Sequence, residues 1–468
     1  MNVDLQNNFL KIIGKVADEN KFKVYVVGGY VRDLITGIED KDIDIMVSGN
    51  GIKFAKLVAE KFGKELDAVY KNFETSLLTI DETKIEFASA RKESYERDSR
   101  KPKIESASVK EDLSRRDFTI NALAAGLNKN NYGEITDLHN GINDLEKKII
   151  RTPLDPLKTF DDDPLRIMRA IRFASKLNFS IEDNTFDAIK VMRNRLDKDK
   201  VVSQERITIE FLQILMSRKP SVGLDLLYRS GVMDIIFPEI SQLEGVDQRK
   251  DYHHKNVFYH TLIVVDNISQ KTDDVWLRFA ALVHDIAKPK TKKFVEGTGW
   301  TFHGHEELGA RMMKKIFQRM KLPMNKLEYV EKLVRMHLRP IPLANEEVTD
   351  SAIRRLAADA GEELEDLLKL CRADITSKNP DKVSKFMTNY EVVEKKILEV
   401  QEKDKLRNFQ SPVRGDEIME ICGLEPGREV GRIKHRIEEA ILEGEIPNEY
   451  ESAKEYLYKI KDEVLKRI

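Results

Sequence analysis

VVGGYVRDLITGIEDKDIDIMV, residues 26–47, indicates the architecture of the amino-terminal part of this chain. An apolar run leads into two adjacent glycines and a short helical pattern, and a second apolar run begins with Asp42 and Asp44. Alternate residues of a strand point to the same face, so these two carboxylates should project together. They repel each other unless cations lie near them, and a pair of divalent ions suits an in-line attack on phosphorus. The stretch therefore predicts a strand, turn, helix and strand that hold divalent metal ions beside a phosphate.

The two glycines at the turn predict a phosphate-binding site. Because Gly28 and Gly29 lack a Cβ atom, backbone N–H groups at the start of the helix can approach a triphosphate closely. Arg32, in the first helical turn, can neutralise phosphate charge, and Asp33 can anchor the turn. The plainer interpretation is an ordinary glycine turn followed by a charged strand edge, and each half of the motif alone is weakly specific.

Further strands and helices follow from the spacing of apolar residues. Strand patterns are KVYVVGG, KDIDIMV, ETSLLTI and TKIEFAS, and helical patterns cover residues 4–20 and GIKFAKLVAEKFG. Glu86 lies in TKIEFAS and is a candidate third metal-binding carboxylate, although an exposed strand glutamate is the simpler interpretation. Residues 90–115 are polar and predict a long functional loop, and from about residue 140 the pattern is helical. The fold class is therefore α+β, with a small head of mixed sheet and helices followed by an all-α remainder.

Length and composition limit the remaining possibilities. The 468 residues suggest roughly three domains, and 41% hydrophobic residues are ordinary for a soluble protein. No apolar run approaches the ~18 residues of a membrane helix, and the first residues lack the pattern of a signal peptide. The two cysteines, Cys371 and Cys422, form no metal or disulfide pattern, which predicts a cytoplasmic protein. We expect no membrane association, and the sequence suggests no protein partner.

A basic stretch between residues 166 and 219 is a candidate nucleic-acid surface. The net charge of −2 does not by itself indicate a nucleic-acid-binding protein. The stretch holds twelve Lys and Arg residues against seven Asp and Glu residues. A solvated helical face explains that excess equally well on charge alone.

Together, GGYVRD and DKDIDI resemble the signature of the DNA polymerase β-like nucleotidyltransferases, in the branch of class II tRNA nucleotidyltransferases and bacterial poly(A) polymerases. RRDFTINALA resembles a second motif of that family, which implies that Arg115, Asp117 and Asn121 contact nucleotide sugar and phosphate. Residues 137–153 resemble the hinge between head and neck, and ERITIEF from Glu205 resembles a motif that stabilises the neck helices. The resemblance extends over nearly the whole chain.

The segment FDDDPLRIMRAIRFA resembles the family's nucleotide-selecting motif Glu-Asp-x-x-Arg, here Asp162, Asp163 and Arg166. Cytosine and adenine both present an amine donor beside a ring-nitrogen acceptor, so a carboxylate and a guanidinium three residues apart on a helix can read either base. Arg169 and Arg172 lie further along the same helix and can meet phosphate or RNA. Asp163, followed by proline, is also a good helix N-cap, and the aspartate in the first position departs from the family's glutamate.

A second constellation combines histidines and aspartates. Adjacent His284 and Asp285 on an apolar helix, with flanking histidines, resemble the HD phosphohydrolase superfamily. Neutral imidazoles and carboxylates suit a divalent metal, and its bound water can attack a phosphoester, whereas a lone buried histidine is usually a core residue. The resemblance implies one metal with four ligands: His260, His284, Asp285 and Asp374. It leaves His305, with His303 as an alternative, and His337 for a second metal or the substrate phosphate.

The resemblance implies four domains: a nucleotidyltransferase head (1–138), a helical neck and body that selects nucleotides and binds RNA (139–250), an HD phosphohydrolase domain (251–380) and a helical tail (381–468). It implies template-independent addition of C, C and A to tRNA 3′ ends from CTP and ATP, with Mg²⁺ at the head and a divalent metal of unknown identity in the HD domain. The polar loop 91–114, which contains Arg97, Arg100 and Lys101, is expected to help the switch from C to A.

Other functions stay open on the sequence alone. The same chemistry serves poly(A) polymerases and partial enzymes that add only CC or only A. A metal phosphohydrolase whose head binds RNA or nucleotide, and an RNA-binding protein with both sites inactive, belong to different classes of function. The intact Asp42 and Asp44 and the complete histidine and aspartate set argue against inactive sites.

Overall fold

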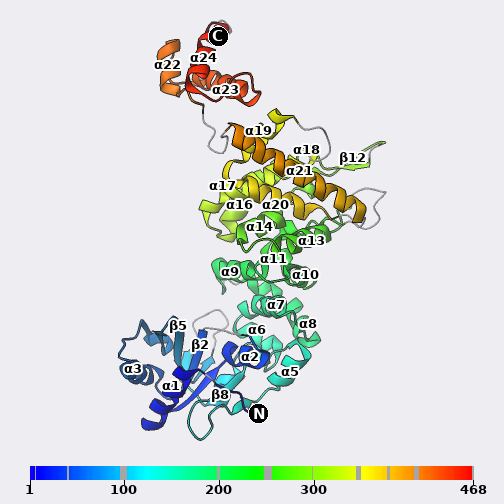
Figure 1. Ribbon diagram of the computed structural model, residues 1–468. Helices are drawn as coiled ribbons and strands as arrows, with labels where there is room; N and C mark the ends of the chain where they lie inside the picture. The colour runs from blue at the N-terminus through cyan, green and yellow to red at the C-terminus, as the bar shows by residue number, and fades with distance from the viewer. Residues whose placement is uncertain are drawn as a thin grey trace. The chain divides into compact units, whose positions relative to one another are not determined.

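The computed structural model divides the chain into two compact units, Met1–Ser241 and Gln242–Ile468 (Figure 1). Ten ranges are described: 1–5, 7–38, 42–94, 103–197, 201–246, 256–297, 299–343, 349–376, 380–404 and 411–465. The first unit combines a mixed sheet with helices and the second is mostly helical, which confirms the predicted α+β class. Within these ranges no helix is both long enough and apolar enough to cross a membrane.

A seven-stranded sheet forms the centre of the first unit. Its strand order is β3-β4-β5-β2-β1-β8-β9, with β2 and β5 parallel and the other neighbouring pairs antiparallel. The strands are β1 (Lys23–Val27), β2 (Asp42–Ser48), β3 (Ala68–Tyr70), β4 (Thr75–Ile80), β5 (Thr83–Ser89), β8 (Leu123–Gly126) and β9 (Ile135–Asp137). The four predicted strands are confirmed as β1, β2, β4 and β5. Strands β3, β8 and β9 have three or four residues each, too few for a recognisable alternation.

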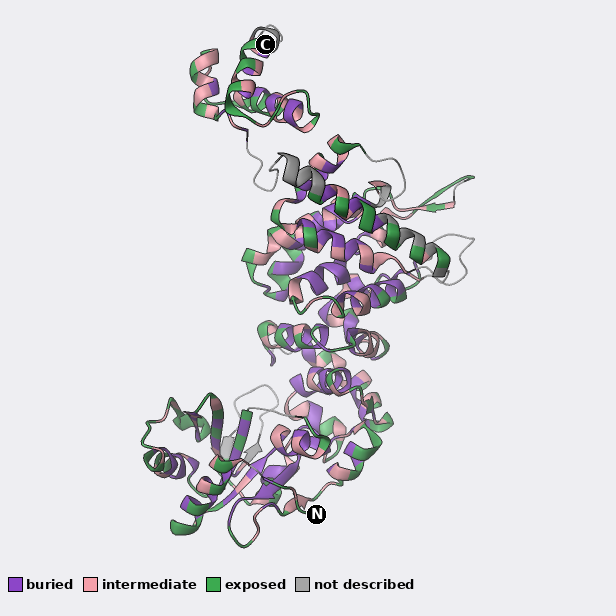
Figure 2. Cartoon of the chain, in the orientation of Figure 1, coloured by how far each residue is buried: buried purple, intermediate pink, exposed green. Residues whose placement is uncertain are grey.

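Three helices accompany the sheet: α1 (Asn8–Glu19), α2 (Gly29–Thr36) and α3 (Gly51–Lys61). The first begins later than the predicted residue 4, because Asn7 caps it by accepting a hydrogen bond from the Phe9 N–H at 2.8 Å. Its buried residues, which include Leu10 and Ile13, recur at helical spacing. Phe54 of α3 is fully buried, and its ring contacts those of Phe22 and Phe87. Figure 2 shows buried residues in purple.

The polar segment 90–115 is more regular than the sequence predicts. It contains the antiparallel pair β6 (Arg91–Ser94) and β7 (Lys103–Ser106), followed by helix α4 (Val109–Ser114). Backbone pairing holds the two strands together without any apolar alternation in their sequence, so the usual strand signal is missing. The predicted loop is therefore wrong for these residues, whereas Arg97, Arg100 and Lys101 lie outside the described residues.

The rest of the first unit is helical, as predicted, apart from the short parallel pair β10 (Ile149–Ile150) and β11 (Ser180–Ile181). Its helices are α5 (Gly141–Lys147), α6 (Pro156–Asp162), α7 (Leu165–Leu177), α8 (Asp183–Met192), α9 (Gln204–Leu215), α10 (Pro220–Arg229), α11 (Met233–Ile236) and α12 (Pro238–Ser241). Helix α7 is almost wholly buried because α6, α9 and α10 pack around it.

The described residues of the second unit form helices and an antiparallel hairpin, β12 (Lys293–Val295) and β13 (Gly299–Thr301). Its helices are α13 (Val257–Ser269), α14 (Val275–Val283), α15 (Lys288–Thr291), α16 (His305–Met320), α17 (Leu327–Met336), α18 (Pro340–Leu343), α19 (Asp350–Ala360), α20 (Leu364–Asp374), α21 (Pro380–Asp404), α22 (Gly415–Cys422), α23 (Arg428–Leu442) and α24 (Tyr450–Leu465). The last three helices share a small core of their own, built around Ile433, Ile437 and Leu457.

Candidate active sites

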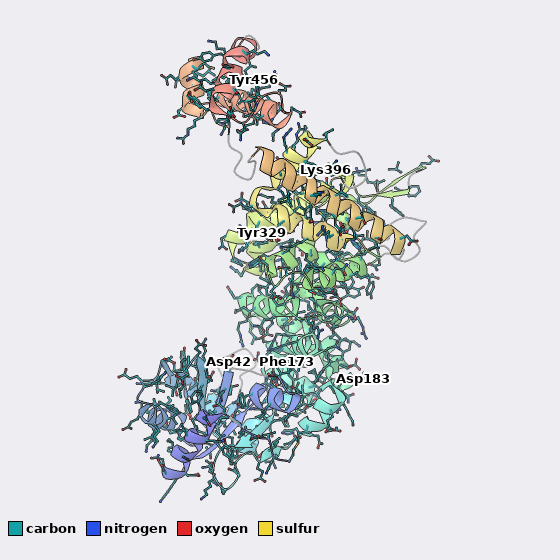
Figure 3. All side chains as sticks on the ribbon, in the orientation of Figure 1. Asp42, Phe173, Asp183, Tyr329, Lys396 and Tyr456 are labelled. Atoms are coloured by element: carbon teal, nitrogen blue, oxygen red, sulfur yellow. The ribbon has the colours of Figure 1, made fainter. Side chains whose placement is uncertain are left out.

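The acidic residues of the opening motif lie together on one face of the sheet. Asp42 and Asp44 are exposed on either side of buried Ile43, so both project to the same face of β2 (Figure 3 labels Asp42). Asp44 is the register partner of Glu86 on the neighbouring strand β5, so these two carboxylates stand side by side. Asp44 and Glu86 line a cleft of about 470 Å³, whereas Asp42 is outside the cleft lining that the described residues form.

The glycine turn passes directly beside this acidic pair. Gly28 has φ 73°, a left-handed conformation that a larger residue rarely adopts, and α2 begins at Gly29. A Cβ atom on Gly28 would lie 3.0 Å from Arg116 Nη1 and 3.6 Å from Asp44 Oδ2. The missing side chain therefore allows the backbone to run close to a carboxylate and a guanidinium at once.

The buried Arg32 side chain stabilises the start of helix α2, next to the glycine turn. It is buried, its Nε and Nη2 each donate to Asp33 at 2.7 Å, and its Nη1 donates to Asn121 Oδ1 at 2.8 Å. Its guanidinium lies 5.3 Å from the ring centre of Phe173 (labelled in Figure 3), which also meets two arginines of α7. Asp33 thus holds Arg32, and sequence reasoning missed the aromatic ring that packs against it.

Asp117 joins the second motif to helix α7. Arg169 donates to Asp117 Oδ2 from Nη2 at 2.6 Å and from Nε at 2.8 Å, and Asn121 donates to Asp117 Oδ1 at 3.0 Å. Burial tends to raise the pKa of Asp117, but the Arg169 charge and these hydrogen bonds outweigh it and lower the pKa to about 2. The carboxylate is therefore ionised at neutral pH and joins residues of the second motif and of α7 in one network.

A second ion-pair network, which the sequence analysis missed, surrounds Asp112 of α4. This buried carboxylate pairs with Arg115 at 2.6 Å and with Arg116 at 3.2 Å, and both arginines line the cleft. The neighbouring arginines hold the pKa of Asp112 below its usual value even though burial, the largest effect, opposes them. Spacings of three and four residues on a helix are the signal that could have identified this cluster.

Asp163 forms the expected helix cap, and the base-reading role of Asp163 and Arg166 stays a prediction. Asp163 Oδ1 accepts a hydrogen bond from the Leu165 N–H at 3.1 Å, as a helix cap does, and both residues line the cleft with Glu86 and Asp44. Arg166 Nη2 donates to the Arg115 carbonyl at 2.7 Å, which fixes the guanidinium against the second motif. Asp162, the last residue of α6, is outside the cleft lining of the described residues, and burial raises its pKa.

Several basic residues between 166 and 219 form ion pairs with carboxylates inside the first unit. Arg172 pairs with Glu210 of α9 at 2.5 Å, and Arg195 pairs with Asp161 at 3.3 Å. Arg206, which sequence reasoning did not single out, lines the cleft. Among the described residues, part of this charge is therefore paired inside the protein, so the stretch is not a uniformly solvated face, and its role as a nucleic-acid surface stays a prediction.

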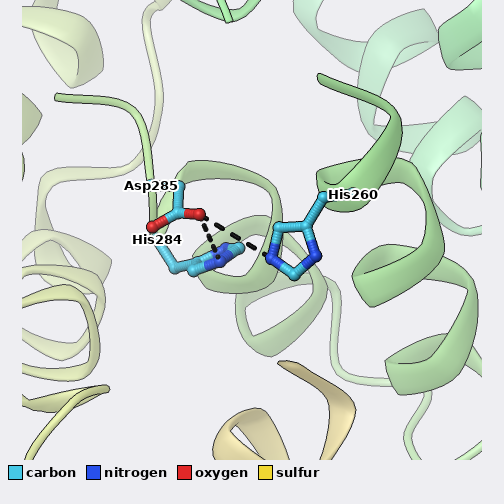
Figure 4. Close-up of side chains that lie close together, drawn as sticks. All are labelled: His260, His284 and Asp285. Carbon is cyan, nitrogen blue, oxygen red and sulfur yellow. Dashed lines mark ion pairs between the residues drawn. The ribbon is translucent and has the colours of Figure 1, made fainter. Parts of the chain in front are cut away.

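The predicted histidine and aspartate cluster comes together in the second unit. His260 of α13 and the adjacent His284 and Asp285 after α14 point toward one another (Figure 4). Nε2 of His284 lies 3.2 Å from Asp285 Oδ2, and Nε2 of His260 lies 2.8 Å from Asp374 Oδ1 and 3.7 Å from Asp285 Oδ2. The four residues predicted to share one metal are thus neighbours.

His305 and His337 face the other oxygen of the same carboxylate. Their Nε2 atoms lie 3.2 Å and 3.8 Å from Asp285 Oδ1. His303, the alternative, is exposed, so the geometry favours His305. Asp285 therefore stands between two histidine groups, an arrangement that suits either of the two predicted uses of the second group.

The imidazoles are oriented as metal ligands are. Backbone carbonyls of Ala281, Phe302 and Val334 lie 2.7–2.8 Å from the Nδ1 atoms of His284, His305 and His337 respectively, which turns each Nε2 inward. All three Nε2 atoms are buried and lack a hydrogen-bond partner of good geometry among the described residues. Buried polar nitrogens without a partner are costly, and a cation among them removes that cost, so these residues fit a divalent metal.

The charges around the cluster agree with this assignment. Burial is the strongest influence on His284, but Asp285 and Asp374 together outweigh it and raise its pKa to about 10. Burial and the neighbouring His284 lower the pKa of His337 to about 3, so this imidazole is neutral. The carboxylates near His284 thus favour a positive charge there, and His337 offers an unprotonated nitrogen.

Three parts of the chain match known domain families. Residues 24–151 match the Poly A polymerase head domain, and residues 252–379 match the HD domain. Between them, residues 178–243 match a domain described as the probable RNA and SrmB-binding site of polymerase A.

Three curated relatives divide between two described activities. An A-adding tRNA nucleotidyltransferase of Aquifex aeolicus is 37% identical over 274 residues, which cover 58% of this chain and 32% of that protein. The multifunctional CCA protein of Neisseria meningitidis is 32% identical over 324 residues, which cover 68% and 72%. An A-adding tRNA nucleotidyltransferase of Deinococcus radiodurans is 28% identical over 428 residues, which cover 90% and 92%. The chain spans about a third of the length of the Aquifex aeolicus relative.

Solved structures share the fold. A tRNA nucleotidyltransferase complexed with a primer tRNA and an incoming ATP analog has a TM-score of 0.59 and 26% identity, covering 82% of this chain and 99% of that one. The Bacillus stearothermophilus CCA-adding enzyme in complex with CTP has a TM-score of 0.68 and 21% identity, covering 98% of both chains. The second likeness concerns the fold alone.

Proposed function

Since this chain belongs to the family of class II tRNA nucleotidyltransferases and poly(A) polymerases, we propose that it adds C, C and A to the 3′ end of tRNA from CTP and ATP. The observation that carries the proposal is the cleft of the first unit, which Asp44 and Glu86, side by side on neighbouring strands, line together with Asp163 and Arg166. Acidic groups for a metal and a base-reading pair thus share one cavity.

In this proposal the acidic face organises the transfer. Mg²⁺ bound at Asp42 and Asp44 would lower the pKa of the primer 3′-hydroxyl and neutralise the departing pyrophosphate. Oxygen ligands on one strand face fit that ion, and Glu86 adds a third carboxylate beside Asp44. Backbone N–H groups at the Gly28–Gly29 turn bind the triphosphate, and Arg116 supplies positive charge beside it.

Base selection falls to Asp163 and Arg166. Asp163 accepts a hydrogen bond from the exocyclic amine of cytosine or adenine while Arg166 donates to the ring nitrogen. Uracil and guanine reverse that donor pattern and leave both groups mispaired, at a cost of roughly 1–3 kcal/mol for each buried group. Asp117 and Asn121 act on the nucleotide through the arginines that they hold in place. Asp117 positions Arg169, and Asn121 positions Arg32.

A second proposal concerns the HD cluster. We propose that it holds a divalent metal and hydrolyses phosphoesters, such as 2′,3′-cyclic phosphates, at damaged RNA 3′ ends. The buried Nε2 atoms that lack a well-formed hydrogen bond support the metal, and a divalent metal would supply an activated water for attack on phosphorus. His260, His284, Asp285 and Asp374 would hold it, which leaves His305 and His337 for a second ion or the phosphate.

The proposal keeps the four domains expected from the sequence. They are the head (1–138), the neck and body (139–250), the HD domain (251–380) and the tail (381–468). The family matches at residues 24–151, 178–243 and 252–379 support this division without fixing its boundaries.

An A-adding enzyme is the second candidate function. The A-adding relatives of Aquifex aeolicus and Deinococcus radiodurans favour it, whereas the multifunctional CCA relative favours addition of all three nucleotides. A poly(A) polymerase uses the same chemistry on other RNA.

Extension of defined tRNA substrates tests these alternatives. One tRNA ends at the discriminator base and another ends in CC, and each receives labelled CTP, labelled ATP or both. We expect the first tRNA to grow by three nucleotides and then stop when both triphosphates are present. Growth of the CC-ending tRNA alone, by one A, identifies an A-adding enzyme, and a long A tail identifies a poly(A) polymerase. No growth of either tRNA overturns the proposal.

A further inference from the structure

The β12–β13 hairpin is a feature of the second unit that the proposed functions leave unexplained. It projects from the helices of that unit as a thin two-stranded arm (Figure 1). Phe294, Val295 and Trp300 are 58%, 44% and 38% exposed on it. A short hairpin cannot bury such side chains by itself, and an exposed apolar group of this kind marks a binding surface.

The same hairpin and its stem are strongly basic. Residues 288–301 contain four lysines and one glutamate, Glu296 at the hairpin turn. Lys290 and Lys293 are exposed, and neither forms an ion pair with a carboxylate in the described part of the chain. An apolar protein partner would gain nothing from this charge, whereas a polyanion would.

Cationic and aromatic groups alternate at close range on the hairpin. Nζ of Lys292 lies 4.5 Å from the ring centre of Trp300, and the rings of Phe294 and Trp300 meet edge to face at 5.3 Å. Aromatic rings on which bases stack, combined with cations that follow the phosphates, are how proteins bind single-stranded nucleic acid without sequence preference. The chemistry therefore fits RNA.

Both ends of the hairpin connect to the HD cluster. On the entry side Lys288 Nζ lies 2.6 Å from Asp285 Oδ2. On the exit side the carbonyl of Phe302, the residue after β13, lies 2.7 Å from His305 Nδ1. Trp300 is two residues from Phe302, or about 7 Å along a strand. A strand of RNA on the hairpin would therefore have its end close to the cluster.

We propose that the β12–β13 hairpin binds the single-stranded 3′ end of RNA and presents its terminal phosphoester to the HD cluster. The presenting role rests on the proposed phosphoester hydrolysis, while RNA binding by the hairpin does not. The substrate of the cluster is then an RNA end that carries a 3′ phosphoester, in preference to a free mononucleotide.

Tryptophan fluorescence tests the binding directly. The chain has two tryptophans, and Trp276→Phe leaves Trp300 as the single reporter, while phenylalanine can keep the packing of Trp276 against Phe279 and Phe317. A short single-stranded RNA should quench this signal in a saturable way. Adding the substitutions Lys292→Ala and Lys293→Ala should weaken the apparent affinity about tenfold and reduce its salt dependence.

The matched control is the pair of substitutions Lys314→Ala and Lys315→Ala, which removes two exposed lysines from helix α16. It should leave the affinity unchanged. Absence of quenching, or an equal loss of affinity in the control, overturns RNA binding by the hairpin.

Hydrolysis separates the presenting role from the binding role. The double variant Phe294→Ala/Trp300→Ala should lower kcat/KM for an oligonucleotide with a 2′,3′-cyclic phosphate about tenfold more than kcat/KM for the cyclic mononucleotide. Tyr458→Ala, which removes an exposed ring with Lys461 Nζ 5.1 Å from its centre, is the matched control and should change neither value. Equal losses on both substrates contradict presentation. If the unaltered protein hydrolyses neither substrate, the proposed phosphohydrolase function is wrong, and the fluorescence experiment still decides RNA binding.

Discussion

At the scale of single residues, Asp117 shows how the second motif, residues 115–124, is held in place. Its carboxylate accepts hydrogen bonds from Arg169 and Asn121, and its pKa in the folded protein is about 2. The corresponding pKa in an unfolded chain is about 3.9. A lowered pKa means that the stabilisation is complete above the unfolded value and is lost as the pH falls through the folded value.

Replacement of Asp117 by asparagine should therefore lower the free energy of unfolding by an amount that depends on pH. At pH 7 we expect Asp117→Asn to lower the free energy of unfolding by about 2 kcal/mol, because the charge of Arg169 loses its buried partner. The difference between the two proteins should shrink between about pH 5 and pH 2. Denaturant unfolding at several pH values measures it, and a difference that does not vary with pH would contradict this account of Asp117.

The sequence predicted which residue types gather at the two sites but not how they pair. Asp163 as a helix cap, and the projection of Asp42 and Asp44 to one strand face, follow from local spacing. The pair formed by Asp117 and Arg169 joins residues 52 positions apart, and no local pattern contains that information. For the same reason, the sequence could not show that Arg32 is already occupied by protein partners.

At the scale of elements, the HD cluster links separate helices of the second unit. Its six residues come from α13, the turn after α14, the start of α16, the turn after α17 and the end of α20. A cation that binds four of them, His260, His284, Asp285 and Asp374, in the folded state and not in the unfolded state would stabilise that packing by mass action.

Removal of metal should lower the thermal stability of the second unit. A divalent metal at 100 times its Kd stabilises the fold by about 2.7 kcal/mol, so a chelator should reduce the unfolding temperature and metal should restore it. His284→Ala should abolish this response, since it removes a ligand that faces Asp285. Differential scanning calorimetry, with elemental analysis of bound metal, measures both effects. If neither chelator nor added metal changes the unfolding temperature, the assignment of a metal to this cluster is wrong.

The elements that the sequence did not predict include the exposed hairpins. Strands such as β2 and β5 can be predicted from the alternation of apolar residues, because one face of each strand packs on the core. In β6–β7 and β12–β13 the strands have only three or four residues and the backbone pairing holds them, so the apolar pattern that marks a strand is weak or missing. The long helices were predictable because their buried stripes recur at helical spacing.

At the scale of the whole molecule, the chain carries two chemically distinct sites in two compact units. The cleft with Asp44 lies in Met1–Ser241, and the histidine cluster lies in Gln242–Ile468. Each site draws its residues from its own unit. Damage to one site should therefore leave the chemistry of the other intact.

The most direct test of the central claim is nucleotide incorporation by Asp44→Ala, measured on tRNA lacking its last three nucleotides. We expect incorporation to fall more than about 100-fold, because the acidic face loses a carboxylate beside Glu86, while phosphoester hydrolysis is unchanged. Asp67→Ala, which removes an exposed carboxylate elsewhere in the same unit, serves as the control and should keep full incorporation. If Asp44→Ala unfolds at the same temperature as the unaltered protein and still incorporates nucleotides within tenfold of its rate, the proposed role of the acidic face is wrong.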